Sequence, residues 1–126
     1  MTEQELTAAA RGLLHTAFNL GEPETAVSEH VGDMFVQHNP QVPDGVEAFI
    51  KFVHSMRSQF PDLHLETIRA IAQGDMVVTH SHMTLTPGEP GLALADFFRF
   101  TDGKVVEHWD VIQNIPDTSA NSNGMF

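Results

Sequence analysis

Asp96, His108 and Asp110 are the residues whose types and spacing could perform acid–base chemistry. A carboxyl group in an apolar pocket is a weaker acid than in water, so its carboxylate is a better base near neutral pH. A second carboxylate nearby raises such a pKa further, whereas an imidazolium lowers it. Asp96 could orient His108 or, as a protonated acid, donate a hydrogen bond to an enolate. The structural alternatives are a cross-strand ion pair and a buried hydrogen-bonded network without catalytic function.

A hairpin from Leu94 to Gln113 is expected to bring these residues together. Thr101-Asp102-Gly103 suits a three-residue loop, with glycine at the position that needs positive φ. This loop places Asp96 directly opposite His108. Because side chains alternate along a strand, one face of the hairpin carries Asp96, Phe98, Val106, His108, Asp110 and Ile112. Both faces are largely apolar, so we expect both to be covered.

The other elements are expected from hydrophobic periodicity and from helix and strand breakers. Helices are predicted over 2–20, 24–30 and 45–59, and strands over 35–38, 63–73 and 76–86. Thr2 and Glu5 have capping-box spacing, and Asp44 is the expected N-cap of the third helix. Helices segregated from a mostly antiparallel sheet make an α+β fold. A strongly curved sheet wrapped around the long N-terminal helix, with two further helices, would enclose a pocket.

Composition favours one globular domain over residues 1–126, with 116–126 as a loose tail. The net charge of −11 argues against nucleic acid and anionic membrane surfaces as partners. No apolar run is long enough for a membrane span, and no signal peptide is visible. The absence of cysteine excludes disulfides and thiolate chemistry, and a cytoplasmic location is favoured.

Three further histidines are candidates for the site. His38 lies where a short strand meets Asn39-Pro40, either at the rim of a pocket or as part of a stable turn. His80 and His82 share one face of a long strand with Val78, and either contact a ligand or are partly buried structural histidines.

A metal site is a further alternative, because imidazole and carboxylate ligands suit zinc or non-haem iron. Its candidate ligands are His38, His80, His82, His108 and Asp110. No HExxH or similar spacing supports this site, and three strands would have to converge to form it. No cofactor is therefore expected.

Two segments resemble the SnoaL-like polyketide cyclases: 35–52 (FVQHNPQVPDGVEAFIKF) and 95–113 (ADFFRFTDGKVVEHWDVIQ). The similarity in element order covers about residues 4–116. This family belongs to a superfamily of cone-shaped α+β folds that includes nuclear transport factor two, ketosteroid isomerase and scytalone dehydratase. The fold hosts many reactions, so the resemblance by itself names no single one.

The resemblance implies roles for individual residues. Asp96 matches an acid that points into the pocket of ketosteroid isomerases, and the positions matching His108 and Asp110 also face that pocket. Asp110 resembles the general base of the cyclases. The same comparison turns three residues of the preceding strand inward, namely Val78, His80 and His82.

The sequence also departs from these relatives. It has no tyrosine for the oxyanion donor of ketosteroid isomerase, and no acid near 38–40 to match that enzyme's base. Arg99 lies on the opposite face from Asp96. This placement excludes the arrangement of limonene-type epoxide hydrolase, in which an arginine lies between two acids inside the pocket.

The leading hypothesis is a cofactor-free polyketide cyclase-like or isomerase-like enzyme, a lyase or isomerase that abstracts a proton from a small apolar carbonyl substrate. The outcome would be aldol-type cyclisation, isomerisation or dehydration. Asp110 would be the base, assisted by His108, Asp96 and His38. Substrate contacts are expected from Val78, His80, His82, Phe52, Phe98 and Ile112.

Other functions remain open at this stage. They are a non-catalytic small-ligand-binding protein, a metal-dependent enzyme and an interaction module. The outer face of the hairpin, with Phe97, Trp109 and Val111, indicates a homodimer.

Overall fold

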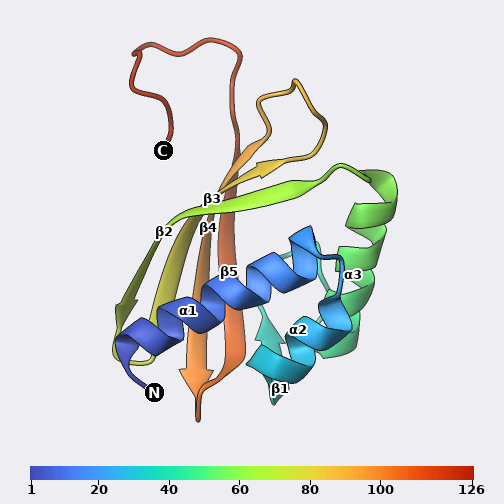
Figure 1. Cartoon of the computed structure of the whole chain (residues 1–126), viewed down its shortest axis with the longest axis vertical. Coiled ribbons are helices and arrows are strands. Elements are labelled where there is room, and N and C mark those ends of the chain that lie inside the picture. Colours follow the sequence, from blue (N-terminus) through green and yellow to red (C-terminus); the bar gives the residue numbers. More distant parts are fainter.

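The computed structural model describes residues 1–126 and has the expected α+β architecture. The chain forms three helices, the first extended by a π-helical turn, and a five-stranded sheet. Figure 1 shows the helices packed against the sheet. The elements in chain order are α1 (Glu3–Leu14), η1 (His15–Asn19), α2 (Pro23–His30), β1 (Val31–Gln37), α3 (Val46–Gln59), β2 (His64–Gln73), β3 (Met76–Thr84), β4 (Leu92–Thr101) and β5 (Lys104–Asn114).

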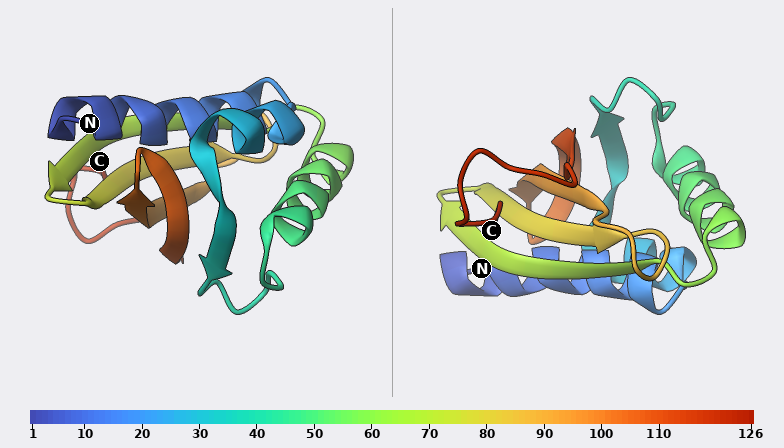
Figure 2. Two further views of the ribbon diagram at one scale, coloured as in Figure 1. Left: turned by 90° about the horizontal axis from the view of Figure 1, so that it is seen from below. Right: turned by 90° about the horizontal axis from the view of Figure 1, so that it is seen from above.

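The strand order in the sheet is β1-β5-β4-β3-β2. β1 runs parallel to β5, and every other pair of neighbours is antiparallel. Figure 2 shows α1 along one side of the curved sheet, with α3 beyond the edge strand β1. The helices therefore cover the concave face, and a pocket can form between them and the sheet. No helix has the length and apolar content needed to cross a membrane.

The long N-terminal helix begins and ends as local sequence signals require. Thr2 Oγ1 accepts a hydrogen bond from Glu5 N–H at 3.1 Å, and Glu5 Oε1 accepts one from Thr2 N–H at 3.3 Å, so the capping box is confirmed. The helix then continues into η1, where Asn19 binds both backbone groups of Leu65 on β2. This pair of bonds ties the end of the helix to the sheet. The apolar stripe of α1 is buried and consists of Leu6, Ala9, Ala10, Leu13 and Leu14.

The expected N-cap of α3 is wrong. Gly45 occupies that position, with φ of +93°, and no side chain caps the helix. The Asp44 carboxylate instead accepts a hydrogen bond from Gln37 N–H at 2.7 Å. Asp44 thereby holds the loop after β1 close to the end of that strand, next to the pocket described below.

The loop between β4 and β5 has two residues rather than the expected three. Asp102 (φ +53°) and Gly103 (φ +77°) are both left-handed, as a type I′ turn requires, and Thr101 pairs with Lys104. The shorter loop is possible because aspartate tolerates positive φ better than most residues. Thr101 therefore stays in β4.

A β-bulge at Val106 then adds one residue to β5. Phe100 pairs with Val105, whereas the preceding residue of β4, Arg99, pairs with Glu107. Val106 is left without a partner, which is the defining feature of a bulge.

The bulge shifts the register between β4 and β5, but Asp96, His108 and Asp110 remain on one face of the hairpin. Asp96 lies opposite Asp110, so the expected placement of Asp96 opposite His108 is wrong. The extra residue restores the alternation, and all three side chains still reach the same pocket. Val105 rather than the expected Val106 is buried beneath them, with 0% exposure.

Replacing Gly103 with alanine should lower the free energy of unfolding by about 1–2 kcal/mol, because a Cβ disfavours the left-handed conformation. Gly103→Asn should cost less, since asparagine tolerates this region. The matched asparagine variant carries the same Cβ towards Met1 Sδ, so that contact cancels in the comparison. Urea unfolding measures both losses. Equal losses in the two variants would contradict the left-handed turn.

Candidate active site

A cavity of about 210 Å³ lies between the helices and the concave face of the sheet. Most of its lining is apolar, with 17 hydrophobic residues among 23. Phe49 and Phe52 of α3, Leu14 of α1 and Phe98 of β4 are part of this wall. The polar lining consists of Gln37, Asn39, Gln41, Asp96, His108 and Asp110.

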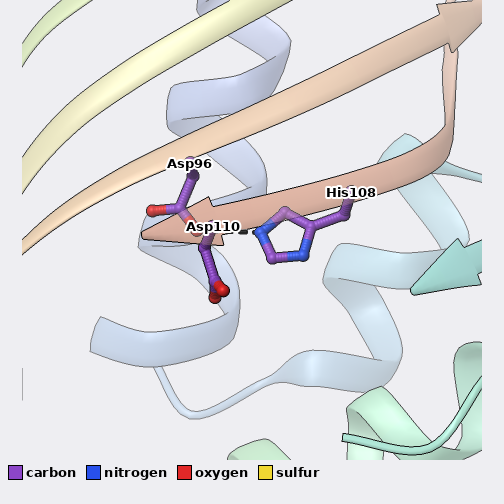
Figure 3. A group of neighbouring side chains, drawn as sticks. All are labelled: Asp96, His108 and Asp110. Carbon is purple, nitrogen blue, oxygen red and sulfur yellow. Dashed lines mark hydrogen bonds and ion pairs between the residues drawn. The ribbon is translucent and has the colours of Figure 1, made fainter. Parts of the chain in front are cut away.

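Asp96, His108 and Asp110 point toward one another from the neighbouring strands β4 and β5 (Figure 3). His108 Nε2 lies 2.8 Å from Asp96 Oδ1. Asp96 is 4% exposed, and its other oxygen, Oδ2, is buried without a hydrogen-bond partner. Burial raises the pKa of Asp96, and the hydrogen bond to His108 opposes that rise only in part. The charge of Asp110 raises the pKa further.

Both ring nitrogens of His108 have hydrogen-bond partners, and two phenyl rings lie beside the imidazole. Its Nδ1 lies 2.7 Å from Gln37 Oε1, at the end of β1. The rings of Phe35 and Phe98 flank the imidazole, with centroid distances of 6.5 Å and 5.2 Å. The imidazole plane and both of its nitrogens are therefore positioned by contacts from β1 and β4.

Asp110 lies where the apolar cavity meets the outside. Its Oδ2 accepts a hydrogen bond from Asn39 Nδ2 at 2.9 Å, and Asn39 Oδ1 accepts one from Gln41 N–H at 2.8 Å. Asp110 is half-buried and also lines an adjoining polar depression with Asn39, Pro40, Gln41, Ile112 and Asn114. This carboxylate can therefore reach both a bound molecule and solvent.

Sequence reasoning missed Gln37 and Asn39. Asn39-Pro40 signalled only the end of a strand, and nothing in the local pattern distinguishes Gln37 from any other strand glutamine. Their roles come from the parallel pairing of β1 with β5, in which Gln37 is the register partner of His108. Gln37 directly precedes His38-Asn39-Pro40, which is recognisable in the sequence as the end of a strand. Its partner, His108, lies far away in the sequence.

Six of the ten expected site residues line the cavity, namely Asp96, His108, Asp110, Phe98, Phe52 and Ile112. His38 does not. It points to the other face of the sheet, where its Nε2 lies 2.7 Å from Glu107 Oε2 and its ring stacks on Trp109 at 4.7 Å. Since Gln37 points inward, alternation sends the next residue outward.

The expected inward orientation of Val78, His80 and His82 is also wrong. Residues that pair directly across a sheet share a face, and Val77 pairs with Phe98, which lines the cavity. The buried face of β3 is therefore Val77, Thr79, Ser81 and Met83.

On the outer face, His80 and His82 have structural partners. His80 accepts a hydrogen bond from Arg69, and His82 donates one to the Pro90 carbonyl at 2.7 Å. Both rings pack against Phe126, with centroid distances of 5.1 Å and 4.8 Å. The segment 116–126 forms no helix or strand, but its last residue lies against the sheet.

The five residues considered as metal ligands are not assembled in one place, because three of them lie on the outer face. The ligand atoms of Asp96, His108 and Asp110 do lie within 4.8 Å of one another. Both nitrogens of His108 are engaged, however, one by Asp96 and the other by Gln37.

The chain matches the family model described as SnoaL-like polyketide cyclase over residues 8–118. With the fold and the pocket described above, this match places the protein in the SnoaL-like polyketide cyclase family. A search of curated proteins gives no match.

Solved structures share the fold. A putative polyketide cyclase from Bacillus cereus ATCC 10987 is 22% identical, with a TM-score of 0.76 over 89% of this chain and 78% of that one. TsrD from Streptomyces laurentii is 22% identical, with a TM-score of 0.74 over 89% and 90%. AclR, a putative hydroxylase from Streptomyces galilaeus, is 25% identical, with a TM-score of 0.73 over 89% and 91%. One of these proteins is described as a putative cyclase and another as a putative hydroxylase, so the shared fold does not specify the reaction.

Asp96→Asn should make the protein more stable at neutral pH, and the gain should shrink as pH falls. A raised pKa means that the folded state binds more protons than the unfolded state, so wild-type stability declines as pH rises above the unfolded value of about 3.9. Asparagine carries no charge, so it abolishes this decline while its amide can still donate to His108. Urea unfolding from pH 4 to pH 8 measures the difference. Parallel curves for the two proteins would contradict it, and Asp62→Asn, at an exposed position, serves as the control.

Proposed function

We propose that this protein is an enzyme that removes a proton alpha to a carbonyl group in a small, apolar, uncharged substrate. The products would arise by aldol-type cyclisation, isomerisation or dehydration. One observation carries the proposal: the polar lining of an apolar cavity is gathered around a carboxylate, Asp110, and a buried Asp96–His108 pair. A base and an acid that differ in environment are what enolisation requires.

Asp110 is the proposed base. Asn39 donates to one of its oxygens and leaves the other free to accept the proton from the substrate carbon. Asp96 and His108 form the proposed acid: the proton that they share in the resting protein moves to the carbonyl oxygen as negative charge develops there. In cyclisation, the enol carbon then attacks a second carbonyl carbon of the same molecule. As the C–C bond forms, the new alkoxide takes the proton held by Asp110, and the enol oxygen returns its proton to the Asp96–His108 pair as the first carbonyl re-forms.

The charge of the site supports an uncharged substrate. No lysine or arginine lines the cavity, and its ionisable residues are two aspartates and one histidine. The whole chain carries a net charge of −11. A free carboxylate or phosphate on the substrate would therefore find no counter-charge in the cavity, whereas an aromatic or aliphatic carbonyl compound fits its Phe, Leu, Val and Met walls.

Asp110→Asn should slow the reaction about 10²- to 10⁴-fold and leave the fold intact, because it removes the base but keeps the shape of the side chain. Exchange of alpha protons for deuterium, followed by NMR on a panel of apolar diketones in D₂O, tests this without knowledge of the natural substrate. His80→Gln, on the outer face, should exchange at the wild-type rate. Wild-type exchange by Asp110→Asn would refute the mechanism, and binding without any exchange would favour a ligand-binding protein.

We also propose that the protein forms a homodimer through the outer face of the sheet. One apolar row crosses this face in register, through Ile71, Val78, Phe97 and Trp109. Ile71 is 60% exposed, and Val111 on the same face is 65% exposed. Exposed apolar residues grouped in this way on a sheet support a protein–protein contact.

Val111→Asp should convert the dimer to a monomer, because it places a charge in the proposed apolar contact. Analytical ultracentrifugation measures the mass of each species. Leu20→Asp is the matched control, since Leu20 is similarly exposed but lies at the end of η1, away from the sheet face. A monomeric wild-type protein would contradict the proposal.

A further inference from the structure

The hydrogen bonds of the Gln37 side chain show which nitrogen of His108 carries a proton. Gln37 Oε1 accepts a hydrogen bond from Asn39 N–H at 3.1 Å. A backbone N–H can only donate, so the atom that faces it is the amide oxygen and not the amide nitrogen. The same oxygen lies 2.7 Å from His108 Nδ1. Because two acceptors cannot share a hydrogen bond, Nδ1 carries the proton in this contact.

The assignment of Nδ1 determines what Asp96 must do. In a neutral imidazole with Nδ1–H, the other nitrogen is an acceptor. Nε2 lies 2.8 Å from Asp96 Oδ1, so the proton between them belongs either to a neutral Asp96 or to an imidazolium paired with a carboxylate. Asp96 Oδ2 is buried without a partner. A buried carboxylate would leave charge on that atom without solvation, whereas a neutral acid leaves only a carbonyl oxygen.

The charged and polar surroundings of His108 agree with a neutral Asp96. β1 contributes Gln37, β4 contributes Asp96, and β5 itself contributes Asp110, and the rings of Phe35 and Phe98 lie beside the imidazole. Asp110 is bound by an amide donor, which suits a carboxylate. A second negative charge on Asp96 would lie beside it in a poorly solvated cavity. A neutral Asp96 avoids placing two carboxylate charges side by side in the cavity.

We propose that Gln37 is a positioning residue that holds His108 as the Nδ1–H tautomer and thereby keeps Asp96 protonated as the acid of the site. The catalytic consequence rests on the proposed function, because only an enolising enzyme uses that acid. The tautomer is a property of the resting protein and can be measured without a substrate.

The first test is ¹⁵N NMR of the His108 ring in the wild type and in Gln37→Leu at neutral pH. The wild type should show a protonated Nδ1 and an unprotonated Nε2. Gln37→Leu removes the acceptor, so the proton should move to Nε2. A bare Nδ1 in the wild type, or two protonated ring nitrogens, would overturn the proposal, even if the leucine variant failed to fold. An unchanged tautomer in a folded leucine variant would also overturn it.

Two matched variants separate positioning from general disturbance. Gln37→Glu keeps an acceptor oxygen of the same reach, so Nδ1 should remain protonated. Gln41→Leu makes the same chemical change in the same cavity, but no hydrogen bond joins the Gln41 side chain to His108. It should leave the tautomer as in the wild type. A shift of the tautomer in Gln41→Leu equal to that in Gln37→Leu would overturn the specific role of Gln37.

Turnover then connects the tautomer to catalysis. Gln37→Leu should lower kcat at least about 10-fold with a smaller change in KM, and Gln37→Glu should recover part of the loss. If Asp110→Asn abolishes exchange while Gln37→Leu changes neither tautomer nor rate, the positioning role is wrong and the proposed function stands. If the tautomer shifts but Asp110→Asn exchanges at the wild-type rate, the positioning role stands and the proposed function is wrong.

Discussion

The parallel pairing of β1 with β5 is the contact on which the site depends. Gln37 is the register partner of His108, and His38 N–H donates to the His108 carbonyl at 3.0 Å. This pairing carries the chain after β1 alongside β5, so that Asn39 reaches Asp110. Without it, the hairpin would still present its acids and histidine, but neither the imidazole nor the Asp110 carboxylate would have its amide partner.

The second constraint is the cost of placing ionisable groups in an apolar cavity. Asp96 is almost fully buried and one of its oxygens has no partner, which favours its neutral form. Asp110 is half-buried, holds an amide donor and adjoins a polar depression. Two chemically identical side chains, opposite each other in the sheet, thus receive different environments. Such a difference is how one site can provide both an acid and a base.

Alternation along the strands decides which histidines belong to this site. The chain has eight histidines, and His108 is the one that lines the cavity. His38 follows an inward residue and so points outward, and His80 and His82 lie on the face of β3 opposite to Met83. An abundance of histidine is therefore a poor guide to the site, because a shift of one residue exchanges the two faces of a strand.

The sequence by itself determined the features that depend on neighbouring residues: the capping box at Thr2, the positive φ of Gly103 in the hairpin loop, and the shared face of His108 and Asp110. These signals involve residues a few positions apart. Only the tertiary structure decided the bulge in β5, which face of β3 is buried, and the approach of Gln37 to His108, 71 residues away. Pairing between distant strands is set by the packing of the whole sheet and its helices, and no local pattern of residue types encodes that register.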